Sequence, residues 1–191
     1  MEHDRVIEIL KEAGAFLEGH FLLTSGKHSG VYLQCAQLFR DARYAEPICR
    51  SLAGQFDGFG IDVVIGPAMG AVQLAYEVGR QLGCQNFFTE REEGKLTLRR
   101  GFTIKPGMRV LVVEDVCTTG GTVREVMEVV ELAGGQTVGV GVVVDRTGGN
   151  LDFGVPLKCA VSMEVLAYDA TDCPICASGL PLVKPGSRKQ T

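Results

Sequence analysis

The sequence predicts an α/β protein with a central, mostly parallel sheet flanked by helices. Segments with helical spacing alternate along the chain with short runs rich in valine and isoleucine, which is typical of strands joined by helical crossovers. Hydrophobic residues make up 46% of the 191 residues and charged residues 22%, so the chain can bury a sizeable core. At this length we expect a single domain over residues 1–191.

The first elements are expected to be a helix, a hairpin and a second helix. Residues 4–13 place apolar side chains on one face at helical spacing, with Asp4 as the cap. Residues 19–34 have apolar runs on either side of a polar turn bounded by glycines, which predicts a hairpin. The second helix is expected over residues 42–56.

The middle of the chain alternates between strand and helix. A β-branched run at 62–66 predicts a strand, and 71–82 is expected to form the helix after it. Residues 86–89 predict a short strand. The stretch at 90–101, which follows it, is highly charged and contains glycine. By itself it would be interpreted as a solvated, salt-bridged surface loop.

The second half of the chain carries the strongest strand pattern, at 109–113. A helix is expected over 122–133, ended by Gly134 and Gly135 as a helix C-cap. Further buried strands are expected at 137–144 and 159–165. Residues 184–191 are expected to fray.

Charge and composition exclude several classes of partner. The net charge of −4 argues against a general nucleic-acid or membrane-surface binder. No stretch approaches the roughly 20 apolar residues of a membrane helix, and the N-terminus lacks the architecture of a secretory signal. Seven cysteines is an odd count, which suits a reduced compartment better than a disulfide framework. We therefore expect a cytoplasmic protein.

Residues 110–122, Val-Leu-Val-Val-Glu-Asp-Val-Cys-Thr-Thr-Gly-Gly-Thr, form the central motif. An apolar strand brings Glu114 and Asp115 to its carboxyl end, where open α/β sheets bind ligands. The glycines let backbone N–H groups surround an anion, and the following helix adds its partial positive charge. Three threonine hydroxyls can donate to phosphate oxygens. A phosphorylated sugar fits this pattern, because carboxylates accept hydrogen bonds from ribose hydroxyls while the loop holds the phosphate.

The motif has alternative interpretations. It is neither a dinucleotide-binding Gly-x-Gly-x-x-Gly motif nor a P-loop, since no lysine follows its glycines. A strand, turn and helix with capping threonines and a solvated acidic pair would suit a generic Asp-x-x-Thr-Gly. However, the whole string resembles the phosphoribosyl diphosphate signature of type I phosphoribosyltransferases, so we favour the ligand-binding interpretation.

Other segments resemble orotate phosphoribosyltransferases in matching order over essentially the whole chain. Residues 21–32 resemble the family's N-terminal segment, and residues 64–70 resemble its pyrophosphate-binding loop. Residues 90–102 resemble its mobile catalytic loop. Asp145-Arg146 matches its pyrimidine-contacting arginine, and segments 173–176 and 182–187 resemble the C-terminus of one bacterial branch. The resemblance implies a type I fold with a small hood formed mainly by residues 1–40 and the C-terminal segment.

The resemblance also implies a reaction and its residues. Orotate and phosphoribosyl diphosphate would give orotidine 5′-monophosphate and diphosphate in pyrimidine nucleotide synthesis, with Mg²⁺ held mainly through the substrate rather than by side chains. A homodimer is implied, because the mobile loop closes over the neighbouring subunit's site. Lys95, Arg91 and Asp115 would be catalytic. Thr118 and Arg146 would contact orotate. The diphosphate loop would comprise Ala68, Met69 and Gly70. Phosphoribosyl diphosphate would contact Arg91, Lys95 and the motif residues Glu114, Asp115, Val116, Cys117, Thr118, Thr119, Gly120, Gly121 and Thr122.

The chain departs from the family pattern at several cationic positions. Thr24, Gly70 and Glu92 stand where many orotate enzymes have lysine, and Thr97 stands where they have histidine. Fewer cations would therefore reach the diphosphate. The candidates to replace them are the arginines of the same loop, Arg99 and Arg100.

Two alternative functions remain open. One is the same fold acting on a purine base, which the matches at 21–32 and at Arg146 disfavour. The other is a non-catalytic RNA-binding regulator, which the acidic balance disfavours. Cys173-x-x-Cys176 could be half of a zinc site or a redox pair, but we favour a structural turn with free thiols. For His20 and His28 we expect structural, hydrogen-bonded roles.

Overall fold

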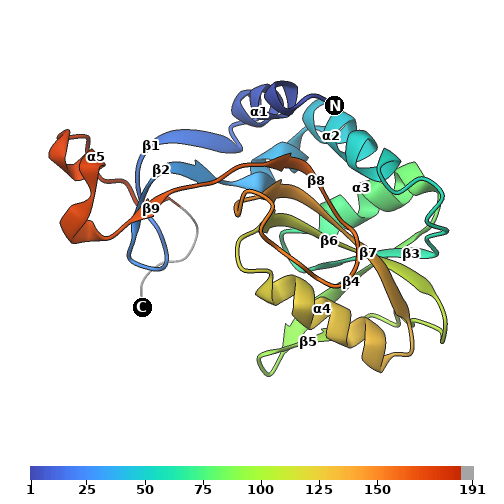
Figure 1. The fold of residues 1–191 in the computed structure, drawn as a ribbon. Helices are drawn as coiled ribbons and strands as arrows, with labels where there is room; N and C mark the ends of the chain where they lie inside the picture. The colour runs from blue at the N-terminus through green and yellow to red at the C-terminus, as the bar shows by residue number, and fades with distance from the viewer. Residues whose placement is uncertain (186–191) are drawn as a thin grey trace.

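A computed structural model describes residues 1–185, so the last six positions of the predicted frayed tail lie outside the described residues. Its larger sheet has the strand order β5-β4-β3-β6-β7-β8 (Figure 1). The strands are β3 (Val63–Pro67), β4 (Gln85–Glu92), β5 (Lys95–Leu98), β6 (Arg109–Cys117), β7 (Gln136–Asp145) and β8 (Leu157–Ser162). Every neighbouring pair is parallel except β4 and β5. The predicted α/β class with a mostly parallel sheet is confirmed.

Helices cover both faces of this sheet. One face packs against α1 (His3–Glu12), α2 (Ala42–Gly54) and α3 (Val72–Leu82), and the other packs against α4 (Gly121–Leu132) (Figure 1). Successive strand residues alternate between the two cores: Leu111 and Val113 face the first group of helices, whereas Val110 and Val112 face α4. Because both faces are buried, β6 is apolar from Val110 to Val113, up to its acidic pair.

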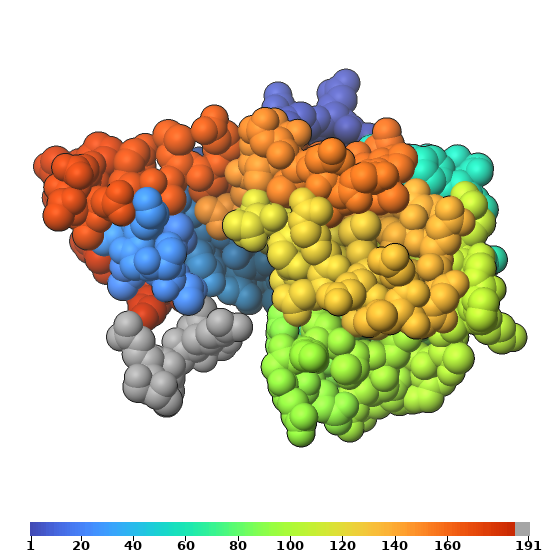
Figure 2. Space-filling view, turned by 60° about the horizontal axis from the view of Figure 1, so that its bottom comes forward, coloured from blue at the N-terminus to red at the C-terminus, as the bar shows by residue number. Residues whose placement is uncertain are grey.

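A second, smaller sheet brings a hairpin from the N-terminal part of the chain together with a strand from the C-terminal part. It has the order β1-β2-β9, formed by the hairpin β1 (Phe16–Leu22) and β2 (His28–Leu33) together with β9 (Ala167–Tyr168). Short helical segments flank it: η1 (Cys35–Arg40), η2 (Ala170–Asp172) and α5 (Pro174–Ala177). In the space-filling view this small sheet and α5 form a blue and red lobe beside the main body (Figure 2).

Some predicted details were wrong. Asp4 does not cap α1, because the helix begins at His3 with Glu2 in the cap position. Asp4 instead lies in the first turn, where its charge still favours the helix dipole. The charged stretch at 90–101 is largely exposed and crossed by ion pairs, as its charges indicate, but part of it is regular, since β4 extends to Glu92 and β5 pairs antiparallel with it. The last predicted strand starts earlier and ends at Ser162.

The other predicted elements are confirmed, with ends shifted by up to a few residues. The ending of α4 follows its prediction: Gly134 takes a positive φ of 83°, and the Gly135 N–H donates to the Val130 carbonyl oxygen at 2.9 Å. Within residues 1–185, every helix is too short or too polar to cross a bilayer.

Candidate active site

The acidic pair lies at the carboxyl end of β6, in the centre of the larger sheet. Glu114 is buried, with 8% of its surface exposed, and Asp115 is half-buried. The Asp115 N–H donates to Glu114 Oε1 at 3.2 Å, and the Val116 N–H donates to Asp115 Oδ1 at 2.7 Å. Burial, and then the neighbouring charge of Asp115, raises the pKa of Glu114 to about 8. Burial also raises the pKa of Asp115. Holding two acids at this position therefore costs free energy. Hydrogen bonds donated by a ligand would offset that cost.

This raised pKa predicts a pH-dependent stability. Between the ordinary pKa of 4.5 and about 8, the folded protein keeps a proton on Glu114 that the unfolded chain releases. Glu114 therefore makes the free energy of unfolding fall as pH rises through this interval, by at most about 1.4 kcal/mol per pH unit. Glu114→Gln mimics the protonated acid, so we expect it to match the wild type at pH 5 and to exceed its stability at pH 8. Urea unfolding at both pH values measures this, and a constant difference between the two proteins would contradict it.

The threonine and glycine segment after β6 forms a small pocket. A cavity of about 40 Å³ is lined by Glu114 and residues 116–123. Gly120 occupies the N-cap position of α4 with φ of 76°, and a Cβ there would lie 2.8 Å from the Phe153 ring. Glycine is thus required at this turn both for its conformation and for space. Because no side chain caps α4, the N–H groups of its first turn are available to an anion.

The predicted diphosphate loop follows β3, the strand beside β6. The Ala68 N–H donates to the Thr89 carbonyl oxygen at 2.8 Å, the Ala68–Met69 peptide is cis, and the Met69 side chain is exposed. A Cβ on Gly70 would lie 2.9 Å from Asp115 Oδ2. The loop backbone therefore lies against the acidic pair. This close approach explains why glycine suits the position, since any larger side chain would displace the Asp115 carboxylate.

Arg146 lies beside the same pocket, directly after β7. Its N–H donates to the Cys117 carbonyl oxygen at 2.9 Å, which connects it to the end of β6. The guanidinium is partly buried, and its Nε has no hydrogen-bond partner among the described residues. Burial lowers its pKa. A partly buried cation with an unused Nε–H donor, on a residue whose backbone contacts Cys117, is suited to a ligand carboxylate.

Asp145 is a positioning residue that the sequence analysis did not assign. It is 1% exposed and accepts hydrogen bonds from the Thr147 N–H and hydroxyl, the Gly149 N–H and the Ser162 hydroxyl, at 2.7–2.8 Å. Burial opposes ionisation, but these hydrogen bonds prevail and lower the pKa of Asp145. Its carboxylate thus fixes the turn after Arg146. The sequence feature that could have pointed to Asp145 is an acidic residue directly after a predicted buried strand.

The β4–β5 hairpin carries the predicted catalytic cations, Arg91 and Lys95. The contacts that Arg91 makes lie outside the acidic pair and the pocket. Arg91 binds Glu125 of α4 at 2.8 Å and donates to the Gly94 carbonyl oxygen at 2.7 Å. Lys95 is exposed at the start of β5. Two further ion pairs cross this hairpin, Arg99 with Glu92 and Arg100 with Glu90. The structure therefore brings together the acidic pair, the threonine and glycine pocket, the diphosphate loop and Arg146, but not Arg91 and Lys95.

A larger cavity, of about 950 Å³, lies away from these residues. It is lined by residues that precede β3, β4 and β6, including Asp62, Cys84 and Met108. It therefore opens at the amino ends of the strands. Open α/β sheets bind ligands at the carboxyl ends, so we place the candidate site at the acidic pair.

Comparison with known proteins identifies the class. Residues 40–153 match the family model described as "Phosphoribosyl transferase domain". The solved orotate phosphoribosyltransferase from Aeropyrum pernix is 30% identical, with a TM-score of 0.67 over 82% of this chain and 93% of that chain. The fold and site thus define a phosphoribosyltransferase of the type I fold.

Two curated relatives narrow the class. The orotate phosphoribosyltransferase of Caldanaerobacter subterraneus subsp. tengcongensis is 54% identical over 99% of this chain and all of the relative. The one from Pelotomaculum thermopropionicum is 55% identical over the same shares. This chain belongs to the orotate phosphoribosyltransferase family.

Proposed function

We propose that the protein transfers the ribose 5-phosphate group from phosphoribosyl diphosphate to orotate, giving orotidine 5′-monophosphate and diphosphate. The observation that carries this proposal is the closeness of Arg146 to the pocket that follows the acidic pair. The acidic pair and the anion pocket follow β6, and the backbone N–H of Arg146, directly after β7, donates to Cys117 of the same pocket. One half of the site suits a phosphorylated sugar, and the other half suits a carboxylate.

The donor is proposed to bind along residues 114–122. The carboxylates of Glu114 and Asp115 would accept hydrogen bonds from the ribose hydroxyls. The N–H groups at the start of α4, with the hydroxyls of Thr118, Thr119 and Thr122, would hold the 5-phosphate. Burial, and then the charge of Asp115, raises the pKa of Glu114, and binding would offset this burial with hydrogen bonds from neutral donors.

The acceptor is proposed to bind at Arg146 and Thr118. The Arg146 guanidinium would form two parallel hydrogen bonds to the orotate carboxylate. The Asp145 carboxylate, fully used by the Thr147, Gly149 and Ser162 donors, would keep the turn in place. This arrangement would hold orotate N1 in line with ribose C1.

In the proposed reaction the N1–C1 bond forms as the C1–O bond to diphosphate breaks, and the proton of orotate N1 passes to the released diphosphate. Positive charge develops at the ribosyl centre, and negative charge collects on the leaving group. When bound, Mg²⁺ would neutralise charge on the diphosphate oxygens. The acidic pair offers the oxygen atoms that suit this ion, although Mg²⁺ commonly binds through substrate phosphates and water. The backbone of Ala68, Met69 and Gly70 would contact the diphosphate.

We further propose that the β4–β5 hairpin moves during turnover to bring Arg91 and Lys95 to the diphosphate. Arg91 would exchange its Glu125 partner for the leaving group. The family resemblance supports closure over a neighbouring subunit, and thus a homodimer. It also supports a single domain whose hood is the small sheet, and a cytoplasmic location. Closure would exclude the water that otherwise hydrolyses the donor.

Lys95→Ala is expected to lower kcat by about 100-fold while changing the Michaelis constant for orotate little, because its charge acts on the leaving group. Steady-state kinetics at saturating donor measure the two constants. Lys105→Ala removes an exposed lysine outside the site, so its kcat and Michaelis constant should equal those of the wild type. A change confined to the Michaelis constant would show that Lys95 does not act on the diphosphate.

The proposed acceptor is tested with a panel of bases. Diphosphate release is measured with phosphoribosyl diphosphate, Mg²⁺ and either orotate, adenine or hypoxanthine, alongside RNA binding at moderate salt. We expect release with orotate alone and no RNA complex. Release with a purine but not with orotate would support the purine alternative, and RNA binding without turnover would support the regulator.

A further inference from the structure

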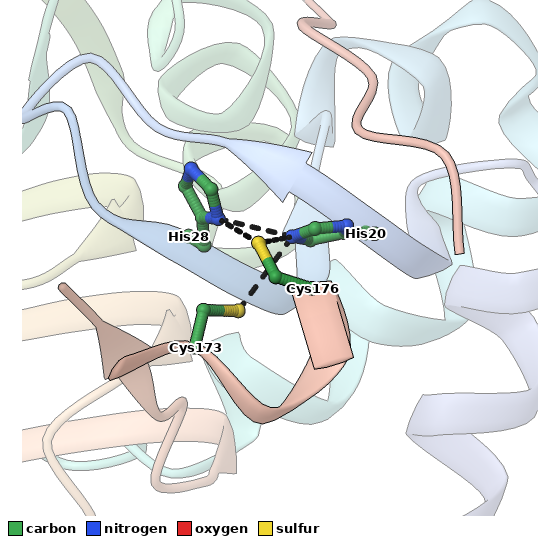
Figure 3. Close-up of side chains that lie close together, drawn as sticks. All are labelled: His20, His28, Cys173 and Cys176. Carbon is green, nitrogen blue, oxygen red and sulfur yellow. Dashed lines mark hydrogen bonds between the residues drawn. The ribbon is translucent and has the colours of Figure 1, made fainter. Parts of the chain in front are cut away.

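Four potential metal ligands meet where the β1–β2 hairpin contacts α5 (Figure 3). They are His20 of β1, His28 of β2, and Cys173 and Cys176 at the start and within the single turn of α5. Their ligand atoms all lie within 4.8 Å of one another. His20, His28 and Cys173 are buried, at 2%, 5% and 5% exposure, whereas Cys176 lies at the surface. None of these residues belongs to the candidate active site.

The spacing of these atoms fits a tetrahedral ion. Bond lengths of about 2.05 Å to nitrogen and 2.3 Å to sulfur place neighbouring ligands about 3.3–3.8 Å apart in a tetrahedron. Sγ of Cys173 and Sγ of Cys176 each lie 3.6 Å from His20 Nε2, and Sγ of Cys176 lies 3.3 Å from His28 Nδ1. The two histidine nitrogens are 3.0 Å apart. That pair would widen slightly, and the two remaining pairs, Cys173 with Cys176 and Cys173 with His28, lie within 4.8 Å, so small side-chain shifts would accommodate an ion.

The outer hydrogen bond of His20 supports ligation. His20 Nδ1 lies 2.8 Å from the Leu180 carbonyl oxygen, which can only accept a hydrogen bond. The proton therefore resides on Nδ1, which leaves the lone pair of Nε2 directed at the two sulfurs. Ligation by one ring nitrogen while the other donates to a carbonyl is the usual arrangement of metal-binding histidines.

The local folds explain how these ligands converge. The register of β1 shifts between Glu18 and Phe21, and Leu22 pairs with His28, so His20 and His28 are diagonal neighbours on one face of the hairpin. Their rings are 4.9 Å apart. The Cys-x-x-Cys spacing places both sulfurs on one side of a helical turn, as in structural zinc sites.

The segment that carries the cysteines is hydrogen-bonded to the hairpin but buries few large apolar side chains. Leu166, Leu180, Leu182 and Val183 are 44–56% exposed, and β9 contributes only two residues to the small sheet. Small, poorly packed lobes of this kind commonly depend on a metal or a disulfide. Here a metal would attach the C-terminal segment to the hairpin.

We propose that His20, His28, Cys173 and Cys176 bind one structural Zn²⁺. Two thiols would release their protons on binding, and two thiolates with two neutral imidazoles would make the site electrically neutral. All four tetrahedral positions are filled by side chains, so the ion stabilises the small sheet and takes no part in catalysis. Both cysteines are free thiols in the structure, as expected, and the histidines that would complete the ligand set come from the hairpin.

Metal analysis of the purified full chain tests the proposal. We expect mass spectrometry of the metals to find about one zinc per chain, the stoichiometry of a closed Cys2His2 site. Cys176→Ser and His28→Ala should lose it. The matched controls Cys84→Ser and His3→Ala, which change residues outside the cluster, should retain it. Cys176 is exposed, so its replacement leaves the buried part of the lobe intact.

Cobalt substitution provides a readout that does not depend on how a variant folds. Co²⁺ added to metal-free wild-type protein should give tetrahedral d–d bands and thiolate charge-transfer absorption, and Zn²⁺ should displace it. Removing zinc should lower the melting temperature of the wild type and leave that of Cys176→Ser unchanged. Substoichiometric zinc with no cobalt spectrum, or equal zinc in the cluster variants, would overturn the proposal. These experiments measure bound metal, so a negative result would not affect the proposed transferase reaction.

Discussion

Arg146→Gln is expected to lower kcat/KM for orotate by about 100- to 1,000-fold. Removing one partner of a buried, hydrogen-bonded charge pair typically costs about 2–5 kcal/mol, and each 1.4 kcal/mol is tenfold. Arg146 suits such a pair because its guanidinium is partly buried and its Nε lacks a partner among the described residues. Steady-state kinetics with orotate, at saturating phosphoribosyl diphosphate, measure the loss.

Two controls make this result specific. Uracil lacks the carboxylate, so Arg146 has nothing to bind in it. The variant and the wild type should therefore be equally slow with uracil. Arg50→Gln, at an exposed arginine of α2, should behave as wild type. Equal losses with orotate and uracil would indicate a general disturbance of the site instead of carboxylate recognition.

Asp115→Asn is expected to reduce kcat/KM for phosphoribosyl diphosphate by about 10- to 100-fold. A hydrogen bond to a charged group contributes about 1.5–3 kcal/mol, and the substitution replaces a charged acceptor with a neutral one of the same shape. Equal shape matters here, because Gly70 lies against this carboxylate and a larger residue would displace the loop. Kinetics and calorimetric titration with the donor measure the change.

Thermal unfolding of the same variant separates a binding defect from loss of the fold. Asp115→Asn should melt at or above the wild-type temperature, since burial raises the pKa of this acid and its charge is a burden in the free protein. Asp57→Asn, at an exposed acid, should change neither property. Unchanged donor affinity in Asp115→Asn would contradict the sugar-hydroxyl role.

The sequence predicted the features that depend on neighbouring residues. The end of β6, the pocket and the start of α4 lie within thirteen consecutive positions, so strand propensity, glycine conformation and helix polarity act on one short string. The alternation of helices and valine-rich runs likewise predicted the parallel sheet. Arg146 was assigned to the acceptor through the family resemblance, and its place directly after a predicted strand is consistent with that assignment.

Features that depend on distant residues could not be predicted in the same way. Cys173 and His20 are 153 positions apart and meet only through the pairing of β2 with β9 and the register shift in β1. Arg91 pairs with Glu125 across 34 positions, which local charge patterns do not specify. The closeness of Gly70 to Asp115 also follows from strand order, because β3 and β6 are neighbours without being consecutive.

Product analysis tests the proposed reaction most directly. The full chain is incubated with orotate, phosphoribosyl diphosphate and Mg²⁺, and the products are quantified by mass spectrometry and by the fall in orotate absorbance. We expect orotidine 5′-monophosphate and diphosphate in equal amounts, with no reaction when the metal is chelated. Diphosphate released without orotidine 5′-monophosphate, or orotate left unconsumed, would contradict the assignment of donor and acceptor to this site.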